Sequence, residues 1–368
     1  MFEEIYRSYD FNSIRERIYS STEADLLRTL GKESIEIDDM IPLFSPAADS
    51  SLEYLARRSR KITRMRFGNV IQLYAPLYIS NECNSSCLYC GFNARSTIRR
   101  VTLTPEQVFR EADILYGMGF RHILLLTGEK RTAVPPEHLS ELIRHMHKKF
   151  SSLSIEVYPM EEDEYSLLTA SGADGLTLYQ ETYDRETYRI VHPAGKKSDF
   201  FWRLNAPDRG GAAGFRRIGI GALLGLSDWR TDGFFTALHA RYLSKKYWRS
   251  HILVSFPRLR NAPESYVPAE TVPDRALVQM VCAMRIIVND AGLVLSTREP
   301  GYMRDNLMPA GITMMSAGSR TNPGGYSGTD IADSQFAVED PRSPDVIADM
   351  IRQKGLDPVW KDWDKNFQ

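Results

Sequence analysis

The run Asn81-Glu82-Cys83-Asn84-Ser85-Ser86-Cys87-Leu88-Tyr89-Cys90-Gly91-Phe92 carries three of the four cysteines of this 368-residue chain. Three thiolates on one short loop can bind three irons of a [4Fe–4S] cube and leave the fourth iron open to another ligand. A structural zinc site needs four ligands, and the nearest histidine, His122, lies far along the chain without ligand spacing. A disulfide would leave one of the three thiols unpaired. The spacing therefore predicts that Cys83, Cys87 and Cys90 hold an iron–sulfur cluster.

The cysteine run follows an apolar stretch, residues 70–79, that predicts a β-strand. Strand and helix patterns then alternate. Further strands are predicted at residues 122–127, 154–159, 174–179, 217–222, 251–256, 294–297 and 312–315, and helices at 104–117, 136–150, 161–171, 231–248 and 274–289. About eight βα units with nearly continuous apolar strands favour an α/β fold, a closed (β/α)8 barrel of the TIM type. The active site of such a barrel lies at the carboxyl ends of the strands, which is where the cysteine run falls.

The flanks of this pattern predict two further parts. Residues 1–70 are polar and helix-like, which indicates an N-terminal helical extension, and residues 71–318 form the barrel. Residues 319–368 are rich in glycine and proline and then briefly helical, which indicates a C-terminal cap. The fourth cysteine, Cys282, lies in an apolar helical run where a buried thiol is commonplace, so we assign it to the core.

The composition is that of a globular protein, with 43% hydrophobic and 25% charged residues. The net charge of −1 gives no bulk electrostatic attraction to nucleic acid or to a membrane. The first residues form no apolar signal region, and no stretch approaches the roughly 20 apolar residues that span a bilayer. We therefore expect a cytoplasmic protein with neither a nucleic-acid nor a membrane partner.

The spacing Cys-x3-Cys-x-aromatic-Cys resembles the signature of the radical S-adenosylmethionine (SAM) enzymes. Further runs resemble the aromatic amino-acid lyases of that superfamily over nearly the whole chain from the sixties onward. These runs are residues 76–83, 90–92, 179–183, 221–228, 255–258, 296–299 and 358–364. The resemblance implies a [4Fe–4S] cluster whose open iron binds SAM and whose electron cleaves SAM to a 5′-deoxyadenosyl radical.

The resemblance also implies a reaction and partners. The enzyme would be a carbon–carbon lyase that splits the Cα–Cβ bond of L-tyrosine into 2-iminoacetate (dehydroglycine) and 4-methylphenol (p-cresol). The 2-iminoacetate would pass to the thiazole synthase ThiG of thiamine biosynthesis, and a flavodoxin- or ferredoxin-type donor would supply the electron. A tryptophan lyase and a hydrogenase-maturation tyrosine lyase are alternatives within the family, although the latter carries a second cysteine cluster and this chain has no cysteine after Cys282. A non-catalytic iron–sulfur electron carrier is the rival from another class.

Two SAM contacts are implied close to the cysteines. Tyr89 matches the aromatic residue before the third cysteine, which usually lies against the adenine ring. The run Thr127-Gly128-Glu129, at the end of the second predicted strand, matches a Gly-Gly-Glu-like turn whose backbone carbonyl takes the SAM amine. Threonine stands here in place of the first glycine. The alternative for this run is a simple turn before the next helix.

Other SAM contacts are implied further along the chain. Glu181 and Arg203 resemble residues that hold the SAM amine or ribose and the SAM carboxylate. Gly221 and Leu223 belong to an element that packs on adenine, where small residues let the backbone approach the ring. A charged residue at a barrel rim is often only solvated, which is the alternative for Glu181 and Arg203.

Arg298 follows the seventh predicted strand and so lies at the mouth of the barrel, where a guanidinium can bind a substrate carboxylate through two parallel hydrogen bonds. Related lyases use an arginine there with a neighbouring serine, so the resemblance implies that Arg298 and Ser296 fix the amino acid. An ion pair of Arg298 with Glu299 or with another acid at the rim is the alternative. Arg258 and Arg260 occupy a similar place after the sixth strand, and the sequence leaves open which arginine contacts the substrate.

Overall fold

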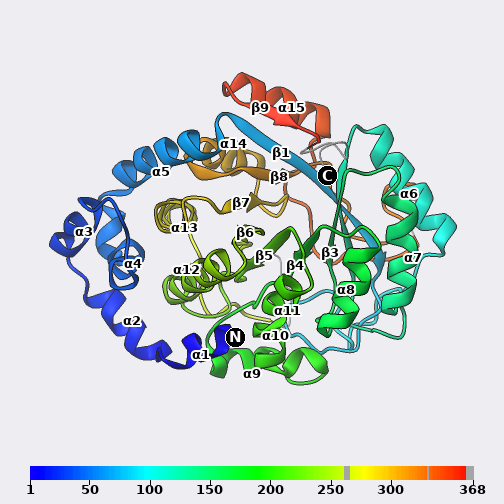
Figure 1. Cartoon of the computed structure of the whole chain (residues 1–368), viewed down its shortest axis with the longest axis horizontal. Coiled ribbons are helices and arrows are strands. Elements are labelled where there is room, and N and C mark those ends of the chain that lie inside the picture. Colours follow the sequence, from blue (N-terminus) through cyan, green and yellow to red (C-terminus); the bar gives the residue numbers. More distant parts are fainter. Residues whose placement is uncertain (261–265, 330, 362–368) are drawn as a thin grey trace.

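The computed structural model describes residues 1–260, 266–329 and 331–361. Within these residues, eight parallel strands close into a barrel at the centre of the molecule (Figure 1). They are β1 (Val70–Ser80), β2 (His122–Thr127), β3 (Ser152–Glu156), β4 (Gly175–Thr177), β5 (Arg217–Gly221), β6 (His251–Ser255), β7 (Gly292–Leu295) and β8 (Met314–Ser316). Strand β1 pairs with both β2 and β8 and so closes the ring. The prediction of a closed (β/α)8 barrel is therefore confirmed.

The register of the first three strands sets the rim on which the site is built. Ser80 of β1 pairs with Thr127 of β2, and Leu126 of β2 pairs with Glu156 of β3. The carboxyl ends of these strands therefore lie at one level. Strand β3 ends at Glu156, three residues before the predicted end.

Helices cover the outside of the barrel (Figure 1). They are α6 (Pro105–Gly117), α7 (Pro136–Met146), α8 (Glu162–Ala170), α9 (Arg185–Val191), α10 (Phe200–Leu204), α11 (Ala206–Ala212), α12 (Trp229–Lys246), α13 (Asp274–Ile287) and α14 (Gly301–Gly311). Helix α6 begins as the sequence indicates, because Thr104 accepts a hydrogen bond from the N–H of Gln107 and Pro105 occupies the first turn. Helices α9, α10, α11 and α14 were not predicted, since they are short or contain proline and glycine.

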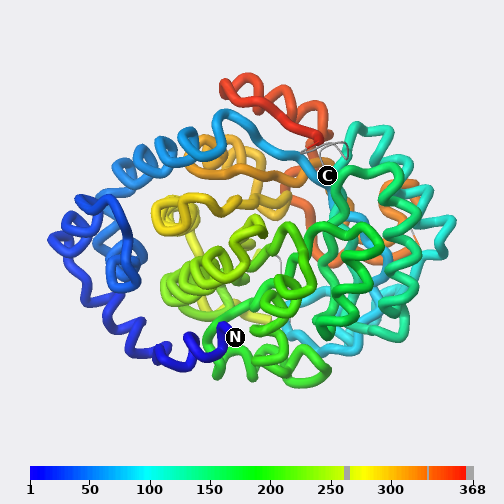
Figure 2. Tube along the Cα trace, in the orientation of Figure 1, coloured from blue at the N-terminus to red at the C-terminus, as the bar shows by residue number. Residues whose placement is uncertain are grey.

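The N-terminal residues form α1 (Phe2–Arg7), α2 (Phe11–Ser20), α3 (Glu23–Leu30), α4 (Ile37–Phe44) and α5 (Leu52–Phe67). Figure 2 shows this blue segment running along the outside of the barrel, past the helices that follow β5 to β7. Helix α5 packs against α13 and α14. At the other end of the segment, the Phe2 ring stacks on His239 of α12 with ring centroids 3.9 Å apart. The predicted helical extension is thus anchored to the barrel at both ends.

The C-terminal residues contain α15 (Pro344–Gln353) and an unpredicted strand, β9 (Asp357–Val359), which pairs in parallel with the start of β1. Arg304 of α14 forms a buried ion pair with Asp340, which fastens this segment to the barrel. Trp360 packs edge-on against Phe120 and so anchors this segment, while Trp363 lies outside the described residues.

No helix in the described part of the chain is both long enough and apolar enough to cross a membrane.

Candidate active site at the carboxyl ends of the strands

The cysteine loop, residues 81–93, is closed on itself by polar side chains. The carbonyl oxygen of the Asn81 side chain accepts a hydrogen bond from the N–H of Val101 (2.7 Å). The Arg100 guanidinium donates to the backbone carbonyls of Asn81 and Asn93, each at 2.6 Å. These contacts tie both ends of the loop together. Arg100 was not recognised from the sequence, because an arginine ten residues after the last cysteine belongs to no metal-ligand spacing.

The four cysteines are free thiols, with Cys87 and Cys282 buried and Cys83 and Cys90 half-buried. Cys282 lies in the core of α13, as predicted. In the described residues no three His, Cys, Asp or Glu side chains converge tightly enough to hold a single metal ion. A [4Fe–4S] cube binds three thiolates through three different irons, so its ligands stand apart rather than converge on a point. The donor set of the loop fits such a cluster.

Burial raises the pKa of the Cys83 and Cys87 thiols. Both groups therefore carry a proton at neutral pH until a metal displaces it, since a coordinating thiol is deprotonated by the metal. The positive charge of Lys197 acts on Cys87 in the opposite direction and favours its thiolate.

Two glycines outside the loop allow the chain to press against it. A Cβ atom on Gly128 would lie 2.1 Å from the carbonyl oxygen of Glu82, and a Cβ on Gly195 would lie 2.6 Å from Cα of Ser85. Gly195 also has φ 92°, a conformation that side-chain-bearing residues rarely adopt. The expected turn at residues 127–129 therefore lies directly against the cysteine loop.

Tyr89 and Leu223 lie in one apolar cluster beside the loop. The Tyr89 hydroxyl is 2.8 Å from Nε2 of His192, whose Nδ1 is 2.9 Å from the carbonyl oxygen of Tyr188. Burial lowers the pKa of His192 to about 3, so the imidazole is neutral. Gly221 lies at the end of β5, where a Cβ atom would be 2.1 Å from the carbonyl oxygen of Ser255. The structure thus brings Tyr89 and Leu223 together and places Gly221 in the barrel wall near them.

Four charged side chains form the group that we call the cofactor wall: Glu129, Glu181, Lys197 and Arg203. Arg203 donates to Glu129 at 2.9 Å, and Lys197 donates to Glu181 at 2.6 Å. Arg203 also lies 3.6 Å from Glu181, which links the two pairs. One oxygen of Glu129 is buried without a hydrogen-bond partner among the described residues. That free acceptor, together with the paired charges, suits a ligand that carries an ammonium and a carboxylate.

Glu181 has both an unusual side-chain pKa and an unusual backbone conformation. Burial would raise its pKa, but Lys197 and Arg203 outweigh that effect and lower the pKa to about 2. In the described chain, Glu181 is the non-glycine residue with positive φ, at 73°. Such a conformation costs of order 1 kcal/mol or more and clusters at functional sites.

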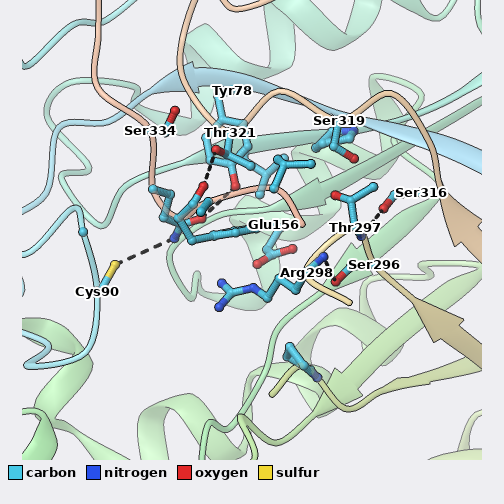
Figure 3. A pocket seen from close by; sticks show the side chains of 18 of the residues that line it. Tyr78, Cys90, Glu156, Ser296, Thr297, Arg298, Ser316, Ser319, Thr321 and Ser334 are labelled. Carbon is cyan, nitrogen blue, oxygen red and sulfur yellow. Dashed lines mark hydrogen bonds between the residues drawn. The ribbon is translucent and has the colours of Figure 1, made fainter. Parts of the chain in front are cut away.

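A cavity of about 650 Å³ opens beside the cofactor wall, at the carboxyl ends of the strands. Figure 3 shows that Cys90, Glu156, Ser296 and Arg298 line the same cavity. Residues from the C-terminal segment complete it: Ser319, Arg320, Thr321, Asn322, Ser334, Gln335, Phe336, Ala337 and Val338. The C-terminal segment therefore forms part of the wall of this cavity.

Arg298 extends into this cavity instead of pairing with its neighbour Glu299. Its guanidinium lies over the Phe336 ring, with Cζ 3.6 Å from the ring centroid. Its backbone N–H is 3.4 Å from the Ser296 hydroxyl. Glu299 is buried and accepts hydrogen bonds from Arg258, at 2.9 Å for the Nε contact, and from Arg260 at 3.2 Å. The alternative of an Arg298–Glu299 ion pair is therefore wrong.

Arg258 is committed to structural contacts, because it is buried and also pairs with Asp274 at 2.9 Å. Arg260 lines the cavity but shares Glu299 with Arg258. Of these three arginines, Arg298 is the one that forms no ion pair with a carboxylate among the described residues.

Three residues of the site were missed in the sequence: Glu156, Lys197 and Gln335. The Gln335 amide lies 3.8 Å from Sγ of Cys90, the contact drawn from Cys90 in Figure 3, and its oxygen accepts from the Tyr78 hydroxyl at 2.7 Å. Glu156 could have been noticed as a carboxylate inside a predicted buried strand. Lys197 and Gln335 lie in irregular segments, and no local pattern marks them.

Comparison with known proteins agrees with this geometry. Residues 77–235 match the model of the Radical SAM superfamily. Residues 255–357 match the Biotin and Thiamin Synthesis associated domain. The barrel and its three-cysteine loop are those of a radical SAM enzyme.

Two curated relatives match almost the whole chain. It is 45% identical to 2-iminoacetate synthase of Escherichia coli (strain K12) and 43% identical to 2-iminoacetate synthase of Salmonella typhimurium; each match covers 99% of this chain and 97% of the relative. Among solved structures, the crystal structure of HydG, a maturase of the [FeFe]-hydrogenase, superposes with a TM-score of 0.89 at 31% identity, covering 96% of this chain and 81% of that one. The chain belongs to the 2-iminoacetate synthase family.

Proposed function

We propose that this chain is a radical SAM lyase that cleaves the Cα–Cβ bond of L-tyrosine to 2-iminoacetate and 4-methylphenol. The observation that carries the proposal is the half-buried guanidinium of Arg298, which faces the same cavity as Cys90 and has no carboxylate partner among the described residues. A guanidinium without a carboxylate partner suits a substrate carboxylate. The identity to 2-iminoacetate synthases over 99% of the chain supports the same reaction.

The cofactors would occupy the other side of the cavity. Cys83, Cys87 and Cys90 would hold a [4Fe–4S] cluster, and SAM would lie between the cysteine loop and the cofactor wall. Bound there, the cluster and SAM supply the radical that takes a hydrogen atom from the tyrosine nitrogen. Tyr89 and Leu223 would pack on the adenine.

The remaining SAM contacts would come from the strand ends. Thr127, Gly128 and Glu129 would receive the SAM amine, because Gly128 lies against the cysteine loop and Glu129 keeps a free oxygen. Glu181 and Arg203 would hold the ribose or amine and the carboxylate. Gly221 would let the backbone of β5 approach the adenine.

The substrate would be fixed by its carboxylate and surrounded at its ring. Arg298 would bind the carboxylate, with the Ser296 hydroxyl beside it, and so present the nitrogen to the radical. Apolar and tyrosyl side chains deeper in the cavity would surround the aromatic ring; they include Tyr74, Tyr78, Leu124 and Leu126.

We further propose that the product passes to the thiazole synthase ThiG and that a flavodoxin- or ferredoxin-type protein supplies the electron. The four free thiols suit a reducing compartment such as the cytoplasm. We also propose three parts for the chain: a helical extension at residues 1–70, the barrel at 71–318 and a cap at 319–368. The cap would share the sheet, since β9 pairs with β1.

Anaerobic reconstitution tests the proposed reaction. The reduced enzyme, incubated with SAM and tyrosine, should yield 5′-deoxyadenosine, 4-methylphenol and glyoxylate, the last from hydrolysis of released 2-iminoacetate. If tryptophan supports turnover and tyrosine does not, the lyase class stands but the substrate is wrong. If the cluster spectrum does not respond to SAM, the proposed function is wrong, and the result favours the alternative of a non-catalytic electron carrier.

A further inference from the structure

Glu156 is a charged side chain of the cavity that the reaction outlined above does not use. It is the last residue of β3, and its carboxylate extends into the cavity (Figure 3). No described side chain forms an ion pair or hydrogen bond with it. The side chain is half-buried, at the wall of the cavity. The chain therefore keeps a carboxylate without a protein partner inside the site.

The surroundings of Glu156 place it between two sets of charges. Burial raises its pKa to about 7, and repulsion from Glu181 acts in the same direction, while the positive charges of Arg298, Arg203 and Lys197 oppose both. Near neutral pH the group is therefore close to half ionised. A carboxyl poised in this range can both attract a cation and exchange a proton with it.

Glu156 and Arg298 face the same part of the cavity without neutralising each other (Figure 3). The Arg298 guanidinium makes a cation–π contact with the Phe336 ring at 3.6 Å and forms no ion pair with the carboxylate. An α-amino acid carries a carboxylate and an ammonium on one carbon. Two opposite charges that are held apart in one cavity match those two groups.

We propose that Glu156 binds the α-ammonium of the substrate amino acid and accepts one of its protons, while Arg298 binds the carboxylate. This inference rests on the proposed function, because it concerns the amino acid that Arg298 would hold. The role is catalytic and not only structural, since the carboxylate contacts the nitrogen that reacts.

The proton transfer balances without another reactant. One N–H bond of the ammonium breaks, its electron pair stays on nitrogen, and the proton forms an O–H bond on Glu156. The α-ammonium of a free amino acid has a pKa of about 9, roughly two units above that of Glu156, so the equilibrium constant of the transfer is about 0.01 and the amine is deprotonated as a minor but accessible form. The neutral amine then carries the lone pair that stabilises a nitrogen-centred radical once a hydrogen atom is removed.

Ligand analogues test the assignment without turnover. Binding is measured by equilibrium dialysis on the cluster-loaded, unreduced enzyme with SAM, using tyrosine, 3-(4-hydroxyphenyl)propanoate, which lacks the amine, and tyramine, which lacks the carboxylate. Glu156→Gln should weaken tyrosine and tyramine binding by about 10- to 100-fold, the loss typical of a hydrogen bond between charged groups. Binding of 3-(4-hydroxyphenyl)propanoate should stay the same or become tighter. Glu141→Gln, an exposed change on α7, is the matched control and should alter none of these affinities.

The pH dependence of 4-methylphenol formation gives a second readout. The carboxylate form of Glu156 must be present, so kcat/KM should fall as the pH drops below about 7, and Glu156→Gln should lose this acidic limb. The titratable groups that face Glu156 do not produce the limb: Glu181, with a pKa of about 2, stays ionised, and burial raises the pKa of Tyr74, Tyr78 and Tyr179. The pKa values of Lys197 and Arg203 are raised, so both stay protonated through this range.

The outcomes separate this inference from the proposed function. If Glu156→Gln weakens 3-(4-hydroxyphenyl)propanoate as much as tyrosine, or leaves the acidic limb in place, Glu156 does not serve the amine and the inference is wrong. If the wild-type enzyme makes no 4-methylphenol and binds none of the three compounds, the proposed function itself is wrong. Glu156→Asp keeps the charge and should restore part of the tyrosine affinity if the variant is folded.

Discussion

The two walls of the cavity carry similar charges but arrange them in opposite ways. On the cofactor wall, Lys197 pairs with Glu181 at 2.6 Å and Arg203 pairs with Glu129 at 2.9 Å, so each charge is already compensated. The second group, which we call the substrate wall, consists of Glu156 and Arg298, and these form no ion pair with a described residue. Paired charges keep a fixed geometry for a cofactor that is needed in every cycle. Open charges keep their binding capacity for a substrate that is consumed.

The paired charges of the cofactor wall and the unpaired charges of the substrate wall should respond differently to mutation. A buried ion pair is strongly destabilised when one partner is removed, because the other charge is left uncompensated. Removal of a half-buried charge that has no partner leaves no other charge uncompensated, so it should have little effect on the folded state and act on the ligand instead. Changes on the cofactor wall should therefore reduce stability and SAM binding, and changes on the substrate wall should reduce substrate binding alone.

The largest effect is expected from the cysteine loop, on which both walls depend. Cys83→Ala, Cys87→Ala and Cys90→Ala should each abolish SAM cleavage, since a three-ligand cluster has no spare thiolate. Cys282→Ala, in the core of α13, should keep the [4Fe–4S] absorption and the activity. Absorption spectra and 5′-deoxyadenosine formation measure both. Loss of the cluster in the Cys282 variant would show that the three-ligand assignment is wrong.

Arg298→Ala should lower tyrosine-dependent 4-methylphenol formation by roughly 1.5 to 3.5 orders of magnitude, because loss of a guanidinium–carboxylate contact in the bound complex costs about 2 to 5 kcal/mol. Slow SAM cleavage without product should largely persist. The free energy of unfolding should fall by less than about 1 kcal/mol, since the variant loses only the cation–π contact with Phe336. Arg298→Lys should recover only part of the activity.

The test measures the amounts of 4-methylphenol and 5′-deoxyadenosine formed in the same reaction. A denaturant unfolding curve of each variant gives its free energy of unfolding. The exposed Arg352→Ala is the control. If both products fall in the same proportion at saturating tyrosine, Arg298 does not hold the substrate carboxylate, and Arg260 becomes the better candidate.

Lys197→Met should have the opposite effects to Arg298→Ala, with a large loss of stability and no loss of substrate affinity. Glu181 would retain only Arg203, at 3.6 Å, so we expect a loss of about 3 kcal/mol in the free energy of unfolding and weaker SAM binding. Lys196→Met, at the exposed neighbouring position, is the matched control. Affinity for 3-(4-hydroxyphenyl)propanoate should not change. An unchanged stability in Lys197→Met would contradict the description of the cofactor wall as mutually compensated.

The same variant gives a pH test. The pKa of Glu181 is lowered from its ordinary 4.5 to about 2, so its contribution to stability is present above pH 4.5 and is lost as the pH falls toward 2. In Lys197→Met the pKa of Glu181 should rise, and the stability difference from wild type should shrink across that acid range. Melting temperatures between pH 6 and pH 3 measure it.

The smallest effect is expected at Gln335, where the cap meets the cluster loop. Its amide contacts Sγ of Cys90 at 3.8 Å, and hydrogen bonds to cluster sulfurs tune the reduction potential. Gln335→Leu should make the cluster potential more negative by tens of millivolts, with the exposed Gln353→Leu as control. Electron paramagnetic resonance during a redox titration measures the shift. A potential equal to that of wild type would mean that Gln335 only positions Tyr78 and the cap.

Features that depend on residues close together in the sequence were predicted correctly, whereas features that depend on contacts between distant residues were missed. The eight strands were recognised because a buried strand requires a local run of apolar residues. The start of α6 was recognised because its capping residues all lie within four consecutive positions. Strand β9 was missed, since a three-residue segment has no period of its own and exists only through its pairing with β1. Helix α11 was missed because its proline and glycine residues argue against a helix locally, and α10 because five residues are too few to show a helical period.

The sequence by itself determined the cysteine loop, the barrel and the arginine at the end of β7, because each depends on residue types at short fixed spacings. Tertiary structure alone decided how the charges are shared. Glu299 accepts from Arg258 and Arg260 across the strand ends and so leaves Arg298 free for the cavity. Lys197 reaches Glu181 over 16 residues, and Gln335 reaches Cys90 over 245. Such contacts depend on distances that only the closed barrel creates, and no local pattern of residues encodes them.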